Sequence, residues 1–182
     1  MTQIDNKKLS LTELDRLSPS AFKSQQKLPI IIVLDNIRSL YNIGSVFRSA
    51  DAFLIEAVYL CGITAQPPHR EIQKTALGAT ETVRWQYFDN THEAIKSLQQ
   101  NHFTIYSVEQ TTNSILLQNI TINTNDKIAL VFGNEVNGVD QDIINQSNAV
   151  IEIPQFGSKH SFNIAVSAGI VMWEVYKKLK IN

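Results

Sequence analysis

Three apolar segments of this 182-residue chain each run directly into a polar loop that contains glycine. Residues 30–34 lead into 36–44, residues 128–132 into 133–138, and residues 150–153 into 155–163. Short apolar runs bounded by turn residues predict buried strands. Ligands of open α/β sheets bind at the carboxyl ends of strands. Three polar strand ends therefore predict one site at the edge of a sheet.

Strand-like and helix-like segments alternate along the rest of the chain. This alternation predicts an α/β fold with a mostly parallel sheet flanked by helices. Residues 109–127 are predicted to form an irregular loop. The expected strands are 30–34, 58–61, 82–88, 103–108, 128–132 and 150–153; the expected helices are 42–54, 69–77, 91–100, 140–146 and one that begins at Ser161.

The length of the chain fits one domain with a buried core. We expect residues 1–28 to form a helical N-terminal extension, in which Ser10 or Thr12 caps a first short helix and Ser18-Pro19 starts a second. The main domain then covers residues 29–182.

Composition excludes several classes of protein. The chain is 43% hydrophobic and 18% charged, as soluble globular proteins are. Its most apolar run, Phe162–Trp173, is too short for a membrane span of about 20 residues, and no signal-peptide core precedes the domain. The single cysteine, Cys61, fits an inert core thiol in a cytoplasmic protein.

Common cofactor and metal motifs are absent from the sequence. The loop Gly133–Gly138 lacks the Gly-Lys-Ser/Thr ending of a P-loop, and no Gly-x-Gly-x-x-Gly pattern occurs. We expect no metal site, because the histidines are scattered at His69, His92, His102 and His160.

Charge is nearly balanced overall, at −1, but unevenly distributed. Residues 1–50 hold seven Lys and Arg against four Asp and Glu, residues 51–150 hold five against eleven, and residues 151–182 hold four against two. The basic excess lies in the segments that carry the first and third polar loops. This pattern fits a basic face for an anionic partner, although ordinary solvated surface gives the same numbers.

The last predicted helix is apolar around nearly its whole circumference. A helix of this kind has to be buried on all sides. A terminal helix of a small domain can hardly achieve that within one copy, so we expect a homodimer. The apolar positions are Phe162, Ile164, Val166, Ile170, Val171, Met172, Trp173, Val175 and Tyr176.

Each polar residue of the three loops has a purely structural interpretation as well. Ser161 and Asn42 are suited to helix N-caps, and on spacing alone the cap is the better reading of Ser161. Arg48 is suited to a surface ion pair, Glu135 to capping amides of its own loop, and Asn163 to bonding a neighbouring carbonyl. The co-occurrence of all five at strand ends favours a shared functional site.

The three segments closely resemble the signature motifs of the SpoU (TrmH-type) RNA ribose 2′-O-methyltransferases of the SPOUT superfamily. Residues 34–53 resemble the first motif, with Asn42, Gly44 and Arg48 in place, and 130–138 the second, with Gly133 and Glu135. Ile153-Pro154 followed by Ser161-Phe162-Asn163 resembles the third. The stretch Lys74–Ala79 matches an intervening element, so the resemblance runs in order over about residues 30–178.

This resemblance implies more than the residue pattern does. Members of the family tie the C-terminal segment into a deep trefoil knot, an exception to the rule that folds are unknotted. They bind S-adenosyl-L-methionine in the knot and act as homodimers on tRNA or rRNA. The implied activity is methyl transfer to a ribose 2′-hydroxyl.

The resemblance also implies roles for individual residues. Arg48 is the catalytic arginine and Asn42 positions it, while Glu135 orients the site and Ser161 and Asn163 form the polar pair of the third motif. The cofactor adenosine is expected against backbone near Glu109, Gly133, Ile153 and Phe162. Position 162 departs from the family, which commonly has Leu there, but both residues provide an apolar wall.

Arg48 has two chemical interpretations. The family account makes it the general base, yet a guanidinium keeps its proton in proteins. Arg48 is equally suited to stabilise the developing alkoxide and to bind the adjacent phosphate, which then accepts the proton.

Two other functions compete with ribose methylation. One is a knotted dimer that binds RNA or cofactor without methyl transfer, which would not need all five polar residues. The other is methylation of a base, which fits the Asn42–Arg48 pairing less well. The basic residues of the N-terminal extension, Lys7, Lys8, Arg16, Lys23 and Lys27, are expected to help grip RNA.

Overall fold

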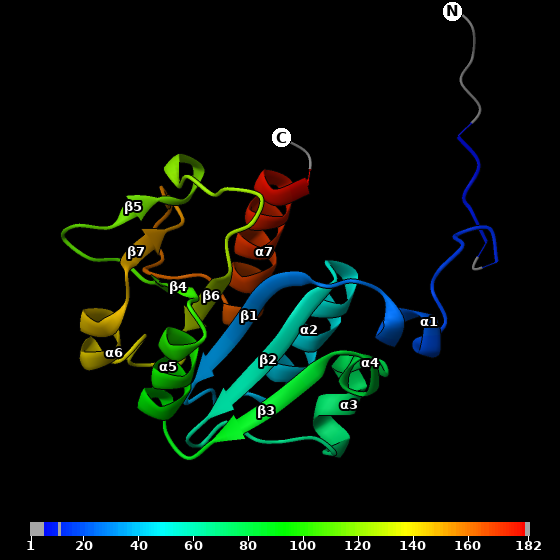
Figure 1. Ribbon diagram of the computed structural model, residues 1–182, viewed down its shortest axis with the longest axis horizontal. Helices are drawn as coiled ribbons and strands as arrows, with labels where there is room; N and C mark the ends of the chain where they lie inside the picture. The colour runs from blue at the N-terminus through cyan, green and yellow to red at the C-terminus, as the bar shows by residue number, and fades with distance from the viewer. Residues whose placement is uncertain (1–5, 11, 181–182) are drawn as a thin grey trace, which may run out of the picture.

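The computed structural model describes residues 6–10 and 12–180 and contains one seven-stranded sheet (Figure 1). The strand order is β3-β2-β1-β6-β4-β7-β5, and every neighbouring pair is parallel. The predicted α/β fold with a parallel sheet is thereby confirmed. The strands are β1 Leu28–Asp35, β2 Ile55–Cys61, β3 Arg84–Phe88, β4 Thr104–Val108, β5 Ile115–Leu116, β6 Ile128–Phe132 and β7 Ala149–Glu152.

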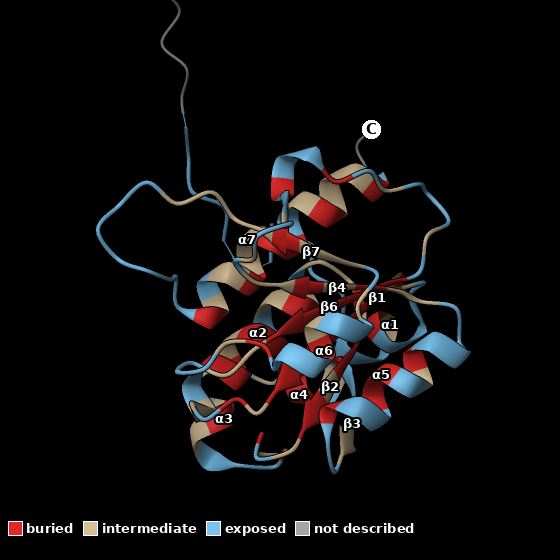
Figure 2. Ribbon diagram, turned by 90° about the vertical axis from the view of Figure 1, so that its left-hand side faces the viewer, coloured by how far each residue is buried: buried red, intermediate tan, exposed pale blue. Residues whose placement is uncertain are grey.

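Helices cover both faces of the sheet (Figure 2). One face packs against α2, α3, α4 and α7, with Phe22 of α1 at its margin, and the other packs against α5 and α6. The helices are α1 Pro19–Ser24, α2 Leu40–Ala52, α3 Arg70–Ala76, α4 Ala79–Thr82, α5 Thr91–Gln100, α6 Gln141–Gln146 and α7 Ile164–Lys180, with a 3₁₀ turn η1 at Leu117–Asn119.

The central strands owe their place to continuous apolar sequence. In β1, Ile30 and Ile32 face the α2–α7 layer, whereas Ile31 and Val33 face the α5–α6 layer. A strand covered on both faces needs apolar residues at every position rather than at alternate ones. The apolar run of β6 is buried at all five positions in the same way.

Two expectations about helix starts are wrong. The last helix begins at Ile164 rather than Ser161, because Asn163 provides the capping oxygen by accepting from the Ala165 N–H at 2.9 Å. Likewise α2 begins at Leu40, and its N-cap is Ser39, whose side chain accepts from the Asn42 N–H. Asn42 therefore lies within the helix, where its side chain is available for tertiary contacts.

The segment 109–127 contains a little regular structure that was not predicted. The two-residue strand β5 pairs with β7 at the sheet edge, and η1 follows it. Leu117 and Ile120 of this segment are buried in the same cluster as α7. The long loop is thus fixed to the core by a few apolar anchors.

The described part of the N-terminal extension contains one six-residue helix, α1, which Ser18 caps as predicted. Residues 12–15 form a turn rather than a helix, while residues 1–5 and 11 of the predicted extension lie outside the described residues, as do 181–182 of the predicted domain. Phe22 is 5% exposed and belongs to the main core cluster. The extension is therefore anchored to the domain by this side chain.

Cys61 is fully buried at the end of β2. Burial is the main cause that raises the pKa of its thiol to about 12. A thiol that stays protonated is a poor nucleophile, which agrees with the inert core cysteine expected from its sequence context.

Candidate active site

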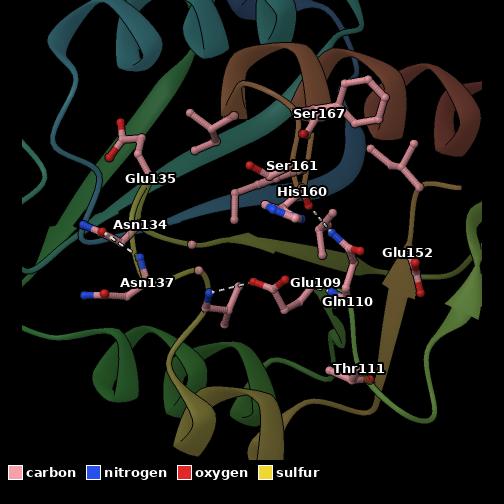
Figure 3. A pocket seen from close by; sticks show the side chains of 18 of the residues that line it. Glu109, Gln110, Thr111, Asn134, Glu135, Asn137, Glu152, His160, Ser161 and Ser167 are labelled. Carbon is pink, nitrogen blue, oxygen red and sulfur yellow. Dashed lines mark hydrogen bonds between the residues drawn. The ribbon is translucent and has the colours of Figure 1, made fainter. Parts of the chain in front are cut away.

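A cavity of about 720 Å³ opens at the carboxyl ends of β4, β6 and β7 (Figure 3). Its walls come from residues 108–111, from 132–139 with Gln141 and Ile144, and from Glu152, Ile153, Gln155, 160–164 and Ser167. The volume is in the range of small-molecule and cofactor sites. Seven of the nine predicted site residues line it: Glu109, Gly133, Glu135, Ile153, Ser161, Phe162 and Asn163.

The carboxylate of Glu135 joins the second polar loop to the first. Its Oε2 accepts from the Arg38 N–H at 2.9 Å, and its Oε1 accepts from the Ser39 N–H and the Asn42 side-chain amide, both at 3.0 Å. The amides of Arg38 and Ser39 that it caps belong to the loop before α2. Glu135 fixes the start of α2 relative to β6.

These donors also decide the charge state of Glu135. Burial alone would raise the pKa of this carboxyl group, but the N–H groups of Arg38 and Ser39 and the Asn42 amide outweigh it. The net effect lowers the pKa below its ordinary value of 4.5. Glu135 is thus an anion at neutral pH, held by neutral donors.

Asn42 connects the first loop to the third. The Asn163 Nδ2 donates to the Asn42 Oδ1 at 3.1 Å, while the Asn42 Nδ2 donates to Glu135. Asn42 is 8% exposed, whereas Glu135 and Asn163 are exposed, so these two contacts are only partly buried. One chain of side-chain hydrogen bonds, Glu135–Asn42–Asn163, thereby links all three polar strand ends.

The loop 133–138 is closed tightly on itself. Asn134 and Gly138 exchange two backbone hydrogen bonds of 2.9 Å, and a Cβ atom at Gly133 would lie 2.0 Å from the Gly138 carbonyl carbon. Only glycine fits at position 133 for this reason. The absence of a side chain lets the loop close on itself, and Gly133 and Gly138 both line the cavity.

Glu109 uses its side chain in a way that was not predicted. Its Oε2 accepts from the Val139 N–H at 3.2 Å and its Oε1 from the Gln110 N–H at 2.8 Å. The adjoining Gln110 donates from its side chain to the His160 carbonyl at 2.7 Å. Residues 109–110 therefore support both the second and the third loop.

Sequence reasoning missed two supporting residues at the end of β1. The buried Asp35 carboxylate accepts from Thr91 Oγ1 at 2.5 Å and from the Asp140 N–H at 3.3 Å. The Asn36 carbonyl accepts from Asn134 Nδ2 at 2.6 Å. Asp35 and Asn36 thus hold the two ends of the loop that carries Glu135. An acidic residue at the end of an otherwise apolar strand was the available signal.

Arg48 lies apart from the cavity wall. It is exposed on α2, two turns beyond Asn42, and makes no ion pair or side-chain hydrogen bond with the described residues. The surface ion pair that a purely structural role of Arg48 would require is therefore not found among the described residues. The guanidinium group is exposed and available to an anionic partner.

Ser161 and Phe162 form the rim of the third loop. Both are exposed, and Phe162 keeps 41% of its surface accessible although it lines the cavity. The Ser161 side chain points into the cavity region beside His160 (Figure 3). Since α7 begins three residues later, Ser161 does not cap it.

Metal ligands do not gather in the described part of the chain: no group of three or more His, Cys, Asp or Glu is placed to hold an ion. Among the same residues, no helix combines the length and the apolar character that crossing a membrane requires.

Residues 29–173 match the SpoU rRNA Methylase family. Over 162 residues the chain is 33% identical to an uncharacterized tRNA/rRNA methyltransferase of Borreliella burgdorferi, covering 88% of this chain and 68% of that protein. It is 29% identical over 150 residues to the 23S rRNA (guanosine-2'-O-)-methyltransferase RlmB of Neisseria meningitidis, covering 82% and 59% of the two chains.

The fold is also shared with solved structures. An AdoMet-bound rRNA methyltransferase from Sinorhizobium meliloti superposes with a TM-score of 0.77 at 24% identity, over 90% of this chain and 62% of that one. The chain therefore spans about three fifths to two thirds of the length of these three proteins.

Proposed function

Because the chain belongs to the SpoU rRNA methylase family, we propose that it transfers a methyl group from S-adenosyl-L-methionine to a ribose 2′-hydroxyl of tRNA or rRNA in the cytoplasm. The observation that carries this proposal is the Glu135–Asn42–Asn163 hydrogen-bond chain, which assembles three separate strand-end loops beside one cavity. Relatives named as tRNA or rRNA methyltransferases agree with it.

The cavity suits the cofactor in size and chemistry. It has apolar walls from Phe132, Ile153 and Phe162, and the side-chain-free backbone at Gly133 provides polar edges for an adenosine group. Glu109 and Glu152 add negative charge to the lining, which suits a cationic sulfonium ligand. Glu109, Gly133, Ile153 and Phe162 would hold the cofactor, which supplies a methyl group on positively charged sulfur.

Arg48 is proposed to act on the RNA rather than on the cofactor. An exposed guanidinium without an ion-pair partner among the described residues can bind a phosphate in a two-pronged manner and stabilise negative charge on the attacking ribose oxygen. The bound phosphate is then placed to accept the proton of the hydroxyl group. Asn42, Glu135, Ser161 and Asn163 position these groups, and positioning of this kind can lower a barrier by roughly 7–11 kcal/mol.

We also propose the C-terminal trefoil knot of the family. Support comes from the path of α7, which packs on α2 on one side and contacts η1 of the 109–127 loop on the other. Lys178 near the end of α7 donates to the Gln118 carbonyl at 3.3 Å. The chain after β7 thus lies between the long loop and the first motif.

A homodimer is proposed from the unburied surface of α7. Val166 is 50% exposed and Trp173 is 48% exposed, although another face of this helix is buried in the core. Trp173 packs only partly, against Phe53 and Tyr176, with ring centroids 6.1 and 5.9 Å away. A second copy would cover these side chains.

The N-terminal extension is proposed to grip RNA, but not beside the site of its own subunit. Lys27 precedes β1 and Asp35 ends it, so the two lie roughly 25 Å apart along the strand. Removal of residues 1–17 tests this idea and retains the buried Phe22. RNA affinity should fall while cofactor affinity stays unchanged. An unchanged RNA affinity would refute a role for Lys7, Lys8 and Arg16, and Lys23→Ala with Lys27→Ala in the shortened protein would then test the remaining two lysines.

The reaction itself can be tested with the purified protein and methyl-labelled S-adenosyl-L-methionine. Unmodified total RNA is the acceptor, an Arg48→Ala variant is the control, and digested nucleosides are resolved by mass spectrometry. Label in a 2′-O-methylnucleoside that is lost in the variant is the expected result. Label on a base would indicate a base methyltransferase. No label with intact cofactor binding would indicate a protein that only binds RNA.

A further inference from the structure

The outer face of α2 carries more than Arg48. Tyr41, Ser45 and Arg48 are spaced i, i+4 and i+7, so they lie on one side of the helix. Tyr41 is 49% exposed although it directly precedes the buried Asn42. The helical rise separates Tyr41 from Arg48 by roughly 10 Å along the axis. An aromatic ring therefore lies on the same face of α2 as the predicted catalytic arginine, about two turns before it.

The Tyr41 side chain is held in place by α3. Its hydroxyl group donates to Glu71 Oε2 at 2.5 Å, and Lys74 pairs with the same carboxylate at 2.8 Å. The Thr75 hydroxyl group also donates to the Tyr41 carbonyl at 3.0 Å. A ring that is anchored at its hydroxyl end and exposed elsewhere is preorganised for contact with a partner.

A purely structural role for Tyr41 explains less. The α2–α3 contact is already close without it, because a Cβ atom at Gly44 would lie 2.2 Å from the Ile72 carbonyl oxygen. A ring that served only to join the helices would bury its surface between them. Tyr41 instead leaves half of its surface to solvent.

Three exposed arginines lie on or beside α2 and α3, the two helices that hold this ring, whose hydroxyl end meets the Glu71–Lys74 pair. Arg38 precedes α2, Arg48 lies on the same face of α2, and Arg70 begins α3, one residue before the anchor Glu71. All three are exposed, and none forms an ion pair or side-chain hydrogen bond with a residue that the structure describes. Exposed arginines around an aromatic ring are the combination that binds single-stranded nucleic acid, by phosphate contacts and base stacking.

We propose that Tyr41 is a stacking platform for the base of a nucleotide that flanks the methylated one, and that Arg38 and Arg70 bind the RNA backbone beside it. This inference rests on the proposed function, since it takes the ribose to face Arg48. It places the main RNA contact of one subunit on the α2–α3 face. The lysines of the extension, at the far end of β1, would then reach other parts of the RNA or the second subunit.

A pair of substitutions separates stacking from the hydroxyl anchor. Tyr41→Leu removes the ring but keeps apolar volume, whereas Tyr41→Phe keeps the ring and removes only the bond to Glu71. Binding is measured by fluorescence anisotropy on two labelled probes, a pool of unmodified tRNA transcripts and unmodified fragments of ribosomal RNA. Calorimetry with S-adenosyl-L-methionine and light scattering report cofactor binding and oligomeric state.

We expect Tyr41→Leu to weaken RNA binding on the order of tenfold and Tyr41→Phe to stay within about threefold of wild type. The KM for RNA should rise with a smaller change in kcat, and cofactor affinity and oligomeric state should not change. Equal losses in both variants, no loss in Tyr41→Leu, a change of oligomeric state, or a wild-type protein that binds neither probe would overturn the proposal.

The same measurements distinguish this inference from the proposed function. If the wild-type protein binds RNA but transfers no methyl group, the proposed reaction fails. The anisotropy comparison of the two Tyr41 variants still decides whether the ring stacks on a base, because that readout needs no turnover.

Discussion

Asn42 and Asn163 stand 121 positions apart in the sequence, yet their side chains share a hydrogen bond of 3.1 Å. Each amide has a second partner: Asn42 donates to Glu135, and Asn163 accepts from the Ala165 N–H at the start of α7. The first turn of the last helix is thereby coupled to the first motif. A disturbance at either end would reach the proposed catalytic region without any contact to substrate.

The two roles of Asn163 can be separated by substitution. Asn163→Asp keeps an oxygen that caps α7 but replaces the donor that faces Asn42 with a second acceptor. Asn163→Ala removes both contacts. We expect Asn163→Asp to lose turnover while its thermal stability stays close to wild type, and Asn163→Ala to lose turnover and about 1 kcal/mol of stability.

Methyl transfer and calorimetric unfolding would check both variants. Wild-type turnover in Asn163→Asp would show that the bond to Asn42 has no catalytic consequence.

Substitution of Arg48 tests whether its shape or only its charge matters. Arg48→Lys keeps a positive charge but loses the planar arrangement of donors that suits a phosphate. Because Arg48 is exposed and makes no ion pair among the described residues, neither Arg48→Lys nor Arg48→Ala should alter stability. We expect both to lower kcat by about 10²-fold or more, with cofactor affinity unchanged.

Single-turnover kinetics on an identified RNA substrate would measure this loss. A near-normal rate in Arg48→Lys would rule out two-pronged phosphate binding and leave charge alone as the contribution of Arg48.

Glu135 gives a prediction for pH dependence. Its pKa is lower in the folded chain than its ordinary value of 4.5, so its anionic form stabilises the fold above that value. The stabilisation is lost as the pH falls through the lower, folded-state pKa. The side chain of Gln in Glu135→Gln does not titrate in this pH range. Its amide N–H₂ group would also face backbone N–H groups that have a carboxylate acceptor in the wild type.

The variant should therefore be less stable than wild type near neutral pH, by about 1 kcal/mol because the site is partly solvated. The difference in the free energy of unfolding between wild type and Glu135→Gln should become smaller as the pH is lowered from about 6 to about 3. Urea unfolding of both proteins over this range measures it, and a gap that does not change with pH would exclude the carboxylate as its source.

Sequence patterns predicted the sheet well because buried parallel strands leave a strong signal. The runs of β1 and β6 are apolar at nearly every position, and the structure places them side by side, with Ile30 opposite Ile128. The strand order around them was not predictable from the residues alone. It depends on which face of the sheet each connecting helix covers, and an apolar helix side packs equally well on either face.

Local capping chemistry limited the prediction of the site. Ser161 is a good N-cap by type, but Asn163 takes that position, and His160 and Ser161 line the cavity instead. Glu109 was expected to contribute only backbone, whereas its carboxylate accepts two amide N–H groups. Such roles depend on which amides a loop leaves unpaired, and this is set by tertiary structure.

The exposed apolar surface of α7 leads to a prediction about assembly. Val166 is half exposed on a helix whose other face contains Ala168, Val171, Met172 and Val175, all completely buried. If a second copy covers this surface, Val166→Glu places a charge in an apolar interface and should dissociate the dimer. Gln100→Glu, an equal change of charge on the exposed side of α5, is the matched control and should have no effect.

Light scattering should give twice the mass of one chain for wild type and Gln100→Glu, and the mass of one chain for Val166→Glu. Circular dichroism would verify that Val166→Glu still folds, as expected for a side chain outside the core of its own subunit. A wild-type protein with the mass of one chain, or a Val166→Glu variant that remains dimeric, would contradict the α7 interface. If Val166→Glu remains dimeric, Val166 is not part of the dimer interface, which then has to lie on another surface.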